Sequence, residues 1–197
     1  MALARDEARL SKTGAVVVET GVYTGRSPED RFIVQTAKNQ KIINWGKVNQ
    51  PISGQDFQKL NKKIQKYLDG LDQNYQTDGW VCADKKERIS VRAVTEFAYQ
   101  ALFTKHILRK GIIKELESKD PDLTILVAPN LKANPKTDGT NSEAFIILNL
   151  EKRLVIIGGT KYAGEIKKSI FSYLNFILPP KKVFPMHCSA NVLKMTV

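Results

Sequence analysis

Three short apolar runs in the second half of this 197-residue chain constrain its fold more than any other feature. LTILVAP (123–129) is rich in branched residues and ends at a proline, which is typical of a buried β-strand. AFIILNL (144–150) and RLVIIGG (153–159) follow, and only Glu151 and Lys152 separate them. This spacing predicts two strands joined by a tight turn, so the core must contain a β-sheet with at least one hairpin.

Three segments with helical periodicity accompany these strands. Residues 52–70 predict a helix with Ser53 as N-cap and Gly70 as stop signal, and residues 95–108 predict a second, capped by the threonine at its start. A third is expected over residues 162–178, ended by two prolines. The apolar residues expected to face the core are Phe57, Leu60, Ile64 and Leu68 in the first helix and Ile166, Ile170, Phe171, Leu174 and Ile177 in the third.

The other strand signals are shorter and scattered along the chain. They are GAVVVETG (14–21), DRFIV (30–34), WVCAD (80–84), RISVRAV (88–94) and VFPMHCSANV (183–192). RISVRAV can also be read as the run-in to the helix that follows it. Strands and helices therefore alternate without a strict βαβ rhythm, which favours an α/β fold with a mixed β-sheet and packed helices. Neither an internal repeat nor a linker divides the chain, so we interpret residues 1–197 as a single domain.

The composition restricts the class of protein. Hydrophobic residues make up 42% of the chain, and no apolar run is long enough to span a bilayer. The N-terminus lacks the apolar stretch of a secretory signal, and two cysteines, Cys82 and Cys188, form neither a disulfide framework nor a zinc site. These features predict a cytoplasmic protein that does not bind membranes.

The chain is strongly basic, with 31 Lys and Arg against 20 Asp and Glu and a formal net charge of +11. Such an excess favours anionic partners, either nucleic acids or small phosphorylated or carboxylated molecules. Many of the lysines lie on helix faces that we expect to be solvated, and no RNP1, zinc-finger or helix-turn-helix pattern is present. Nucleic acid is therefore the disfavoured partner.

The first candidate functional motif is TGRSP (24–28), which lies between two predicted strands. Its Arg26 follows a glycine, and a guanidinium in such a loop can bind a carboxylate through two hydrogen bonds. The plainer interpretation is a solvated arginine in a surface turn, because connecting segments run over the surface.

The second motif is GGTKYAGEIKKSIF (158–171), a glycine-rich junction that opens a helix. The Gly-Gly-Thr sequence can bring backbone N–H groups close to an anion. Lys167 and Lys168 lie in the first turns, where the helix dipole is already positive. Three interpretations stay open: solvated lysines, binding of phosphate or carboxylate, or one neutral lysine that ligates a metal ion.

The third motif is MHCSA (186–190), which places His187 after the proline-terminated helix. A single histidine is more often structural than catalytic. Cys188 next to it suggests a Cys–His nucleophile, but neighbouring residues on a strand point to opposite faces, which argues against that pair. The other histidine, His106, lies on the polar side of a predicted helix and receives no role.

These motifs, in this order, resemble ATP-dependent phosphoenolpyruvate carboxykinase. TGRSPEDRF, NSEAFIILNL, GGTKYAGEIKKSIF and MHCSAN carry the resemblance, and INWGKVNQPIS and RAVTEFAYQALF extend it from about Gly14 to Asn191. The resemblance implies the N-terminal domain of that fold. The family converts oxaloacetate and ATP to phosphoenolpyruvate, carbon dioxide and ADP in gluconeogenesis. It uses Mg²⁺ with the nucleotide and a second divalent ion, typically Mn²⁺.

The resemblance also implies roles for five residues. Arg26 would bind the substrate carboxylate, and Tyr162 would line the site for substrate and carbon dioxide. Lys168 resembles a ligand of the Mn²⁺ ion that also reaches the substrate and the nucleotide phosphate. His187 resembles the second protein ligand of the same ion and lies near the phosphate, while Lys167 adds positive charge there. Arg26, Lys168 and His187 are therefore the expected catalytic residues.

The resemblance stops before a complete enzyme. None of the 197 residues forms the G-x-x-x-x-G-K-[ST] loop that cradles ATP, and the acidic third metal ligand expected after it is missing too. We expect a substrate-binding domain without the C-terminal nucleotide-binding domain. This chain alone should then bind Mn²⁺ weakly or not at all and should be inactive.

Two functions of different classes stay open. In the first, the chain is part of a carboxykinase that binds oxaloacetate and phosphoenolpyruvate, with ATP bound only when a C-terminal domain is supplied. In the second, it is a stand-alone, non-catalytic protein that binds an anion or a partner protein. A downstream reading frame encoding a P-loop domain would favour the first.

Overall fold

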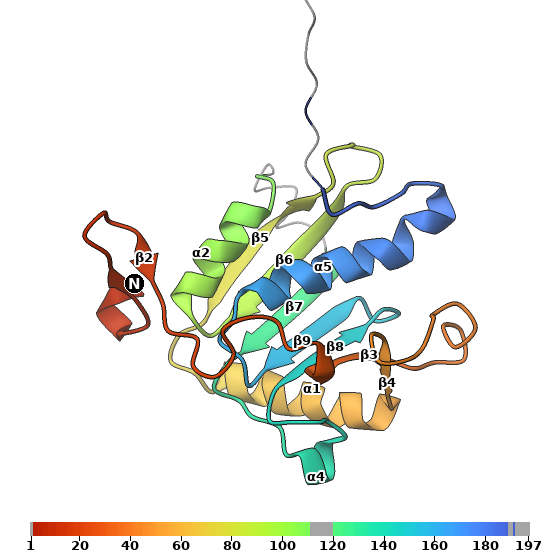
Figure 1. Ribbon diagram of the computed structural model, residues 1–197, viewed down its shortest axis with the longest axis horizontal. Helices are drawn as coiled ribbons and strands as arrows, with labels where there is room; N and C mark the ends of the chain where they lie inside the picture. Colours follow the sequence, from red (N-terminus) through yellow and green to blue (C-terminus); the bar gives the residue numbers. More distant parts are fainter. Residues whose placement is uncertain (1, 111–119, 189–190, 192–197) are drawn as a thin grey trace, which may run out of the picture.

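The computed structural model of the chain describes residues 2–110, 120–188 and 191, and it shows a three-layered α/β fold (Figure 1). The strands of the main sheet are β3 (Arg31–Val34), β4 (Gln50–Ile52), β5 (Tyr75–Val81), β6 (Ile89–Thr95), β7 (Leu123–Ala128), β8 (Phe145–Asn149) and β9 (Leu154–Gly158). The helices are α1 (Gly54–Asp69), α2 (Ala98–Ile107), α4 (Pro135–Asp138) and α5 (Gly164–Ile177), with short 3₁₀ turns η1 (Leu3–Arg5), η2 (Pro28–Asp30) and η3 (Pro179–Lys181).

The sheet is mixed and has seven strands in the order β4-β3-β8-β9-β7-β6-β5. β3 runs parallel to β4 and β8, and β7 runs parallel to β6 and β9. The pairs β8–β9 and β5–β6 are antiparallel. The predicted fold class and the predicted β8–β9 hairpin are therefore confirmed. A separate two-stranded ribbon pairs β1 (Arg9–Leu10) with β2 (Val16–Val17).

The central strands are buried on both faces. All five residues of β8 are buried, as are five of the six residues of β7. Helices cover the sheet on either side, so alternate residues of these strands cannot point to water. This explains why the three apolar runs in the sequence are nearly continuous instead of alternating with polar residues.

α1 covers one face of the sheet through the apolar stripe that its sequence predicts. Phe57, Leu60, Ile64 and Leu68 are buried and pack in one cluster with side chains of β3, β8 and β9. The helix begins after Ser53, whose hydroxyl accepts a hydrogen bond from the N–H of Asp56 at 3.0 Å. The predicted cap and the predicted stripe are both confirmed.

α5 and α2 cover the opposite face (Figure 1). Ile166 and Ile170 of α5 are buried as predicted, together with Tyr173. Leu174 and Ile177 are only partly buried at the edge of the same cluster. Phe171 is also only partly buried and lines a surface pocket, so its assignment to the core was wrong.

Several predicted boundaries were wrong. Thr95 does not cap α2, because its backbone pairs with β5 and β7 at the end of β6, and Ala98 begins the helix. The strand expected over 14–21 is reduced to Val16–Val17. Of the strand expected over 183–192, residues 183–188 pair with no strand of the described chain, and 189, 190 and 192 lie outside the described residues.

Among the described residues, no helix has the length and hydrophobicity that crossing a bilayer requires.

Candidate functional site

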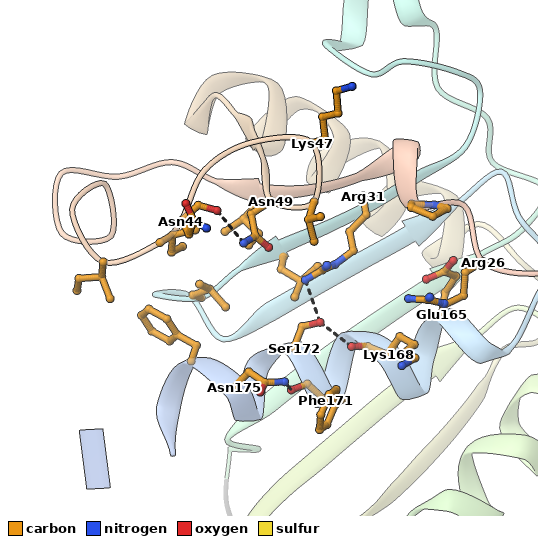
Figure 2. Close-up of a pocket in the computed structure, with 18 of the residues that line it drawn as sticks. Arg26, Arg31, Asn44, Lys47, Asn49, Glu165, Lys168, Phe171, Ser172 and Asn175 are labelled. Carbon is orange, nitrogen blue, oxygen red and sulfur yellow. Dashed lines mark hydrogen bonds between the residues drawn. The ribbon is translucent and has the colours of Figure 1, made fainter. Parts of the chain in front are cut away.

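A pocket of about 790 Å³ opens between α5, the start of β3 and the segment 42–49 that leads to β4 (Figure 2). Its lining includes four cationic side chains and one carboxylate, namely Arg26, Arg31, Lys47, Lys168 and Glu165. Apolar side chains from α5 and from segment 42–49 complete the wall. The excess of positive charge suits an anionic ligand.

The TGRSP loop is fixed against the first turn of α5. The backbone N–H of Ser27 donates to Glu165 Oε1 at 2.9 Å. The Ser27 hydroxyl also donates to the buried carboxylate of Asp30 in η2. Figure 2 shows the side chains of Arg26 and Glu165 next to each other at the start of α5. The loop therefore holds Arg26 at the mouth of the pocket, where its side chain is exposed.

Glu165 is a buried acid in a cationic setting, with only 2% of its surface exposed. Burial raises the pKa of its carboxyl group, whereas the Ser27 N–H, Arg26 and Arg31 act in the opposite direction. Burial prevails, so the charged form of Glu165 is less favoured than in water. Its place in the first turn of α5 is still favourable for a negative charge.

Arg31, the first residue of β3, reaches across to α5. Its Nη2 donates to Ser172 Oγ at 2.9 Å, and Ser172 in turn donates to the carbonyl oxygen of Lys168 at 2.8 Å. Burial lowers the pKa of the Arg31 guanidinium, Glu165 opposes this, and Arg26 adds to it. The side chains of Arg31 and Ser172 thus connect β3 to the turn of α5 that carries Lys168 (Figure 2).

The two adjacent lysines of α5 have different neighbours. Lys168 lines the pocket, and its Nζ lies 5.6 Å from the centre of the Phe171 ring. Lys167 is exposed, and its Nζ lies 3.3 Å from Nε2 of His187. The His187 ring lies 5.8 Å, centre to centre, from the same Phe171 ring. Phe171 therefore has Lys168 and His187 as neighbours.

Tyr162 and the glycine pair belong to the connection between β9 and α5. A Cβ atom on Gly164 would come within 2.4 Å of the Tyr162 ring, so this ring packs against the backbone of the helix start. Gly159 has a φ of +70°, and a Cβ there would lie 2.3 Å from the carbonyl oxygen of Glu143. A glycine is therefore required by the tight turn. Neither Tyr162 nor the Gly-Gly-Thr sequence lines the pocket.

Lys168 and His187 form at most part of a metal site in this arrangement. His187 contacts Lys167, and the two implied ligands are both nitrogen donors. Within residues 2–110, 120–188 and 191, no group of three or more His, Cys, Asp or Glu side chains is placed to hold a metal ion. Hard divalent ions usually take six or more ligands, mostly oxygens. We therefore assign no chemical step to a metal.

Sequence reasoning missed Arg31, Glu165 and Ser172. Each is an ordinary helix or strand residue in the sequence, and its partner lies more than a hundred positions away. Glu165 lies about 100° and 140° around the helix from Ile166 and Ile170, and an acid is common in a first turn, so helical periodicity gives no signal for it. Arg31 carries no signal in the sequence either.

Comparison with known proteins identifies relatives over nearly the whole chain. A family model described as "Phosphoenolpyruvate carboxykinase" matches residues 1–196. "Phosphoenolpyruvate carboxykinase (ATP)" of Geobacillus kaustophilus (strain HTA426) is 50% identical over 190 residues, which are 96% of this chain and 36% of the relative. "Phosphoenolpyruvate carboxykinase (ATP) 1" of Moorella thermoacetica (strain ATCC 39073 / JCM 9320) is 50% identical over 192 residues, 98% of this chain and 36% of the relative.

A third relative is "Phosphoenolpyruvate carboxykinase (ATP)" of Brevibacillus brevis (strain 47 / JCM 6285 / NBRC 100599), 48% identical over 194 residues. Those residues are 98% of this chain and 37% of the relative. The chain thus spans little more than a third of the length of the curated relatives that it matches.

Proposed function

The chain belongs to the phosphoenolpyruvate carboxykinase family, and on that premise we propose that it provides the substrate-binding region of an ATP-dependent carboxykinase. The family comprises carboxy-lyases. The proposed substrates are oxaloacetate and phosphoenolpyruvate, interconverted with ATP and ADP. Nucleotide binding and turnover would additionally need a nucleotide-binding domain. The relatives are long enough to contain one, because the matched region is only 36% of their length.

The pocket beside α5 carries this proposal. Oxaloacetate and phosphoenolpyruvate are small molecules with two anionic groups each. The pocket is lined by four cationic residues and a single acidic one, Glu165. The cations therefore outnumber the carboxylate at the pocket, which supports binding of a dianion.

The residues of the chain then have distinct proposed roles. Arg26 binds a substrate carboxylate, since a guanidinium matches it with two parallel hydrogen bonds. Lys168 adds an ammonium group at the α5 side of the pocket and stabilises the enolate that decarboxylation produces. Tyr162 does not line the pocket, and its proposed place beside the substrate rests on the resemblance alone. All three roles stay predictions.

Lys167, Lys168 and His187 are the proposed contacts to phosphate, and Lys168 and His187 the proposed ligands of a divalent ion. As a ligand, Lys168 would be the neutral amine, so its role as an ammonium group applies when no ion is bound. When bound, such an ion would stabilise negative charge near the substrate. Two ligands leave most of its coordination shell to water, so we expect weak Mn²⁺ binding. Calorimetric titration of the chain and of the Lys168→Ala/His187→Ala double variant measures this. Micromolar binding that vanishes in the double variant would contradict the argument from ligand number.

Binding of phosphoenolpyruvate tests the proposed function directly. We expect Arg26→Ala and Lys168→Ala each to weaken binding about tenfold or more, because each removes a charge-assisted hydrogen bond. Lys62→Ala removes an equal charge from the exposed side of α1 and should leave the affinity unchanged. Titration followed by calorimetry or by ligand NMR gives the affinities. Equal affinities for all four proteins would reject the site.

Turnover tests the expected dependence on a second domain. A polypeptide of only these 197 residues contains no P-loop motif, and phosphoryl transfer depends mainly on positioning the nucleotide phosphates. We expect it to form no phosphoenolpyruvate from oxaloacetate and ATP in a coupled assay. Formation of phosphoenolpyruvate would contradict this expectation. Binding of the substrate anion without any turnover, even with a P-loop domain added, would favour the alternative of a non-catalytic anion-binding protein.

A further inference from the structure

Arg31 differs from an ordinary structural arginine in how little of its hydrogen-bonding capacity the protein uses. A guanidinium has five N–H donors. Among the described residues, Arg31 makes one side-chain hydrogen bond, from Nη2 to the hydroxyl of Ser172. Its Nε is buried and has no acceptor within the described part of the chain. No carboxylate of the described residues lies within ion-pairing distance, although Glu165 lines the same pocket.

Arg92 on β6 shows the contrast within the same molecule. Its Nε and Nη2 donate to the two carboxylate oxygens of Asp78 at 2.9 and 3.0 Å. Asp78 accordingly raises the pKa of Arg92, whereas burial lowers the pKa of Arg31. A partly buried guanidinium is costly unless an anion pairs with it. The fold itself supplies a carboxylate partner for Arg92, namely Asp78. Among the described residues, Arg31 has no carboxylate paired with it in this way.

The position of Arg31 is nevertheless fixed. Ser172 accepts from Arg31 and donates to the carbonyl oxygen of Lys168, so the guanidinium is held beside the α5 turn that carries Lys168. The TGRSP loop is held to the start of the same helix through Glu165. Three cations, Arg26, Arg31 and Lys168, thus line one pocket, and Ser172 orients the guanidinium of Arg31 among them (Figure 2). Several cations around one pocket suit a small ligand with more than one anionic group.

We propose that Arg31 binds the second anionic group of the substrate, while Arg26 binds the first. This inference rests on the proposed function, since it assigns Arg31 to the same pocket and the same ligands. Arg31 then distinguishes dianions, such as oxaloacetate and phosphoenolpyruvate, from monoanions such as pyruvate. Its planar fork pairs with a carboxylate or a phosphoryl group through donors that the protein leaves unused.

The test compares the affinities for phosphoenolpyruvate and pyruvate in matched variants. We expect Arg31→Gln to weaken phosphoenolpyruvate binding about 10- to 100-fold and pyruvate binding far less, since one charge-assisted contact is lost only with the dianion. Arg31→Lys keeps the charge without the fork and should recover part of the selectivity. Ser172→Ala removes the hydroxyl that orients the guanidinium and should give a smaller loss.

Arg92→Gln is the matched control, because it removes a guanidinium that the fold already pairs with a carboxylate. It should lower the midpoint of thermal unfolding and leave both affinities unchanged. If Arg31 has only a structural role, Arg31→Gln will behave in the same way, and this overturns the inference.

The two proposals fail differently. If Arg26→Ala weakens phosphoenolpyruvate binding and Arg31→Gln does not, the inference is wrong and the proposed function stands. If the unsubstituted chain does not bind phosphoenolpyruvate, both are wrong.

Discussion

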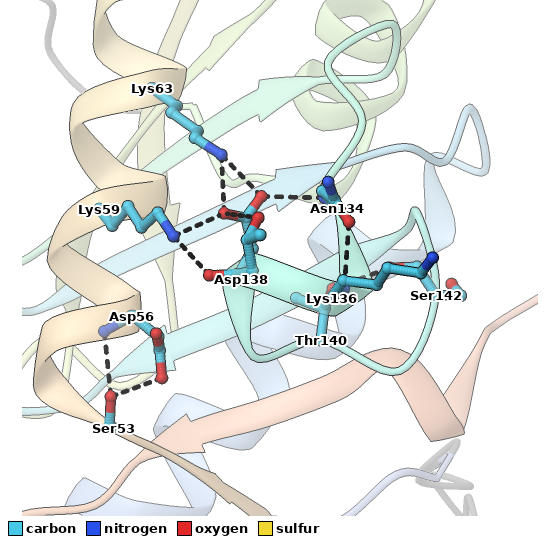
Figure 3. Close-up of polar contacts among 10 residues, drawn as sticks. Ser53, Asp56, Lys59, Lys63, Asn134, Lys136, Asp138, Thr140 and Ser142 are labelled. Atoms are coloured by element: carbon cyan, nitrogen blue, oxygen red, sulfur yellow. Dashed lines mark hydrogen bonds and ion pairs between the residues drawn. The ribbon is translucent and has the colours of Figure 1, made fainter.

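The helices on the two faces of the sheet have similar lengths, 16 residues in α1 and 14 in α5, but different chemistry at their polar contacts. Each helix lies beside a buried carboxylate. Beside α1, this acid is Asp138 of α4, and two lysines neutralise it (Figure 3). On α5, the acid is Glu165, and its cationic neighbours line an open pocket. The carboxylate of Asp138 is paired with lysines inside the fold. Near Glu165, by contrast, Arg26 and Arg31 line a pocket that is open to a ligand.

Asp138 shows how a buried charge is satisfied inside a fold. Its side chain is fully buried and accepts from the backbone N–H of Asn134 at 2.9 Å and from Lys63 at 2.7 Å. Lys59 lies 3.2 Å from the same carboxylate. Burial acts to raise the pKa of Asp138, but these donors outweigh it and lower the pKa to about 2. The carboxylate therefore favours the folded state.

Glu165 shows the opposite balance. It has one backbone donor, from Ser27, and two arginines that attract it without forming an ion pair in the described chain. Burial prevails and raises the pKa of its carboxyl group. Under the proposed function, the cations near α5 bind a ligand, whereas the lysines beside Asp138 stabilise the fold.

The largest effect expected from this comparison concerns the stability of Asp138→Asn. The pKa of Asp138 falls from 3.8 to about 2 on folding. Each unit of pKa is worth about 1.4 kcal/mol, so loss of the charge should lower the free energy of unfolding at pH 7 by roughly 2–3 kcal/mol. Glu165→Gln should cause no loss, because folding disfavours the charge of Glu165. Urea unfolding at pH 7 measures both.

Asp69→Asn removes the same charge from an exposed position near the end of α1 and serves as the control. It should change the stability by less than about 0.5 kcal/mol. A loss in Glu165→Gln equal to that in Asp138→Asn would mean that the two acids have the same structural role, and the distinction between the two faces would fail.

The sequence predicted those features of the fold that depend on residues close together in the chain. The stripe of α1, its Ser53 cap and the buried strands follow from residues a few positions apart. The contacts that distinguish the two faces join distant positions. Lys63 and Asp138 are 75 residues apart, and Ser27 and Glu165 are 138 apart. Their pairing is decided by how the strands are ordered in the sheet, which local patterns do not contain.

The residues of the candidate site also form two groups, those that local sequence motifs predicted and those that only the structure shows. Arg26 and Lys168 stand in motifs that the resemblance identified, and the structure places both in one pocket. Arg31 and Ser172 become visible only when β3 and α5 lie side by side. The wrongly placed start of α2 has a similar cause, because Glu7 accepts from the N–H of Ala98 across 91 residues and no local cap is needed.

A smaller effect is expected at the helix starts. Ser53→Ala removes the hydroxyl that accepts from Asp56 and should lower the stability by about 1 kcal/mol. Ala163 precedes α5 with helical backbone angles, φ −63° and ψ −21°, so a serine there cannot adopt the usual capping geometry. Ala163→Ser should therefore leave the stability unchanged. Thermal unfolding of both variants measures the difference, and a clear gain in Ala163→Ser would show that α5 is open to capping.

The smallest expected effect is the pH dependence that Glu165 contributes. The pKa of Glu165 is higher in the folded state than its ordinary value of 4.5. From pH 4.5 up to the folded-state pKa, the folded chain therefore binds more protons than the unfolded chain. Stability due to Glu165 therefore falls as the pH rises through this window, and the deficit persists above it. Asp138 acts in the reverse direction and lower on the scale, because its stabilisation is complete above about pH 4 and is lost towards pH 2.

Thermal unfolding of the unsubstituted chain and of Glu165→Gln between pH 4 and pH 7 isolates the contribution of Glu165. The variant has no carboxyl group at this position to titrate, so its advantage in stability should grow as the pH rises. Glu19→Gln removes an exposed acid outside the main pocket and controls for the change in net charge. A difference that shrinks with rising pH would mean that Arg26 and Arg31 do neutralise Glu165 in solution. Glu165 would then be stabilised by neighbouring cations as Asp138 is. Arg31 would be paired with Glu165 and less available to bind an anionic ligand.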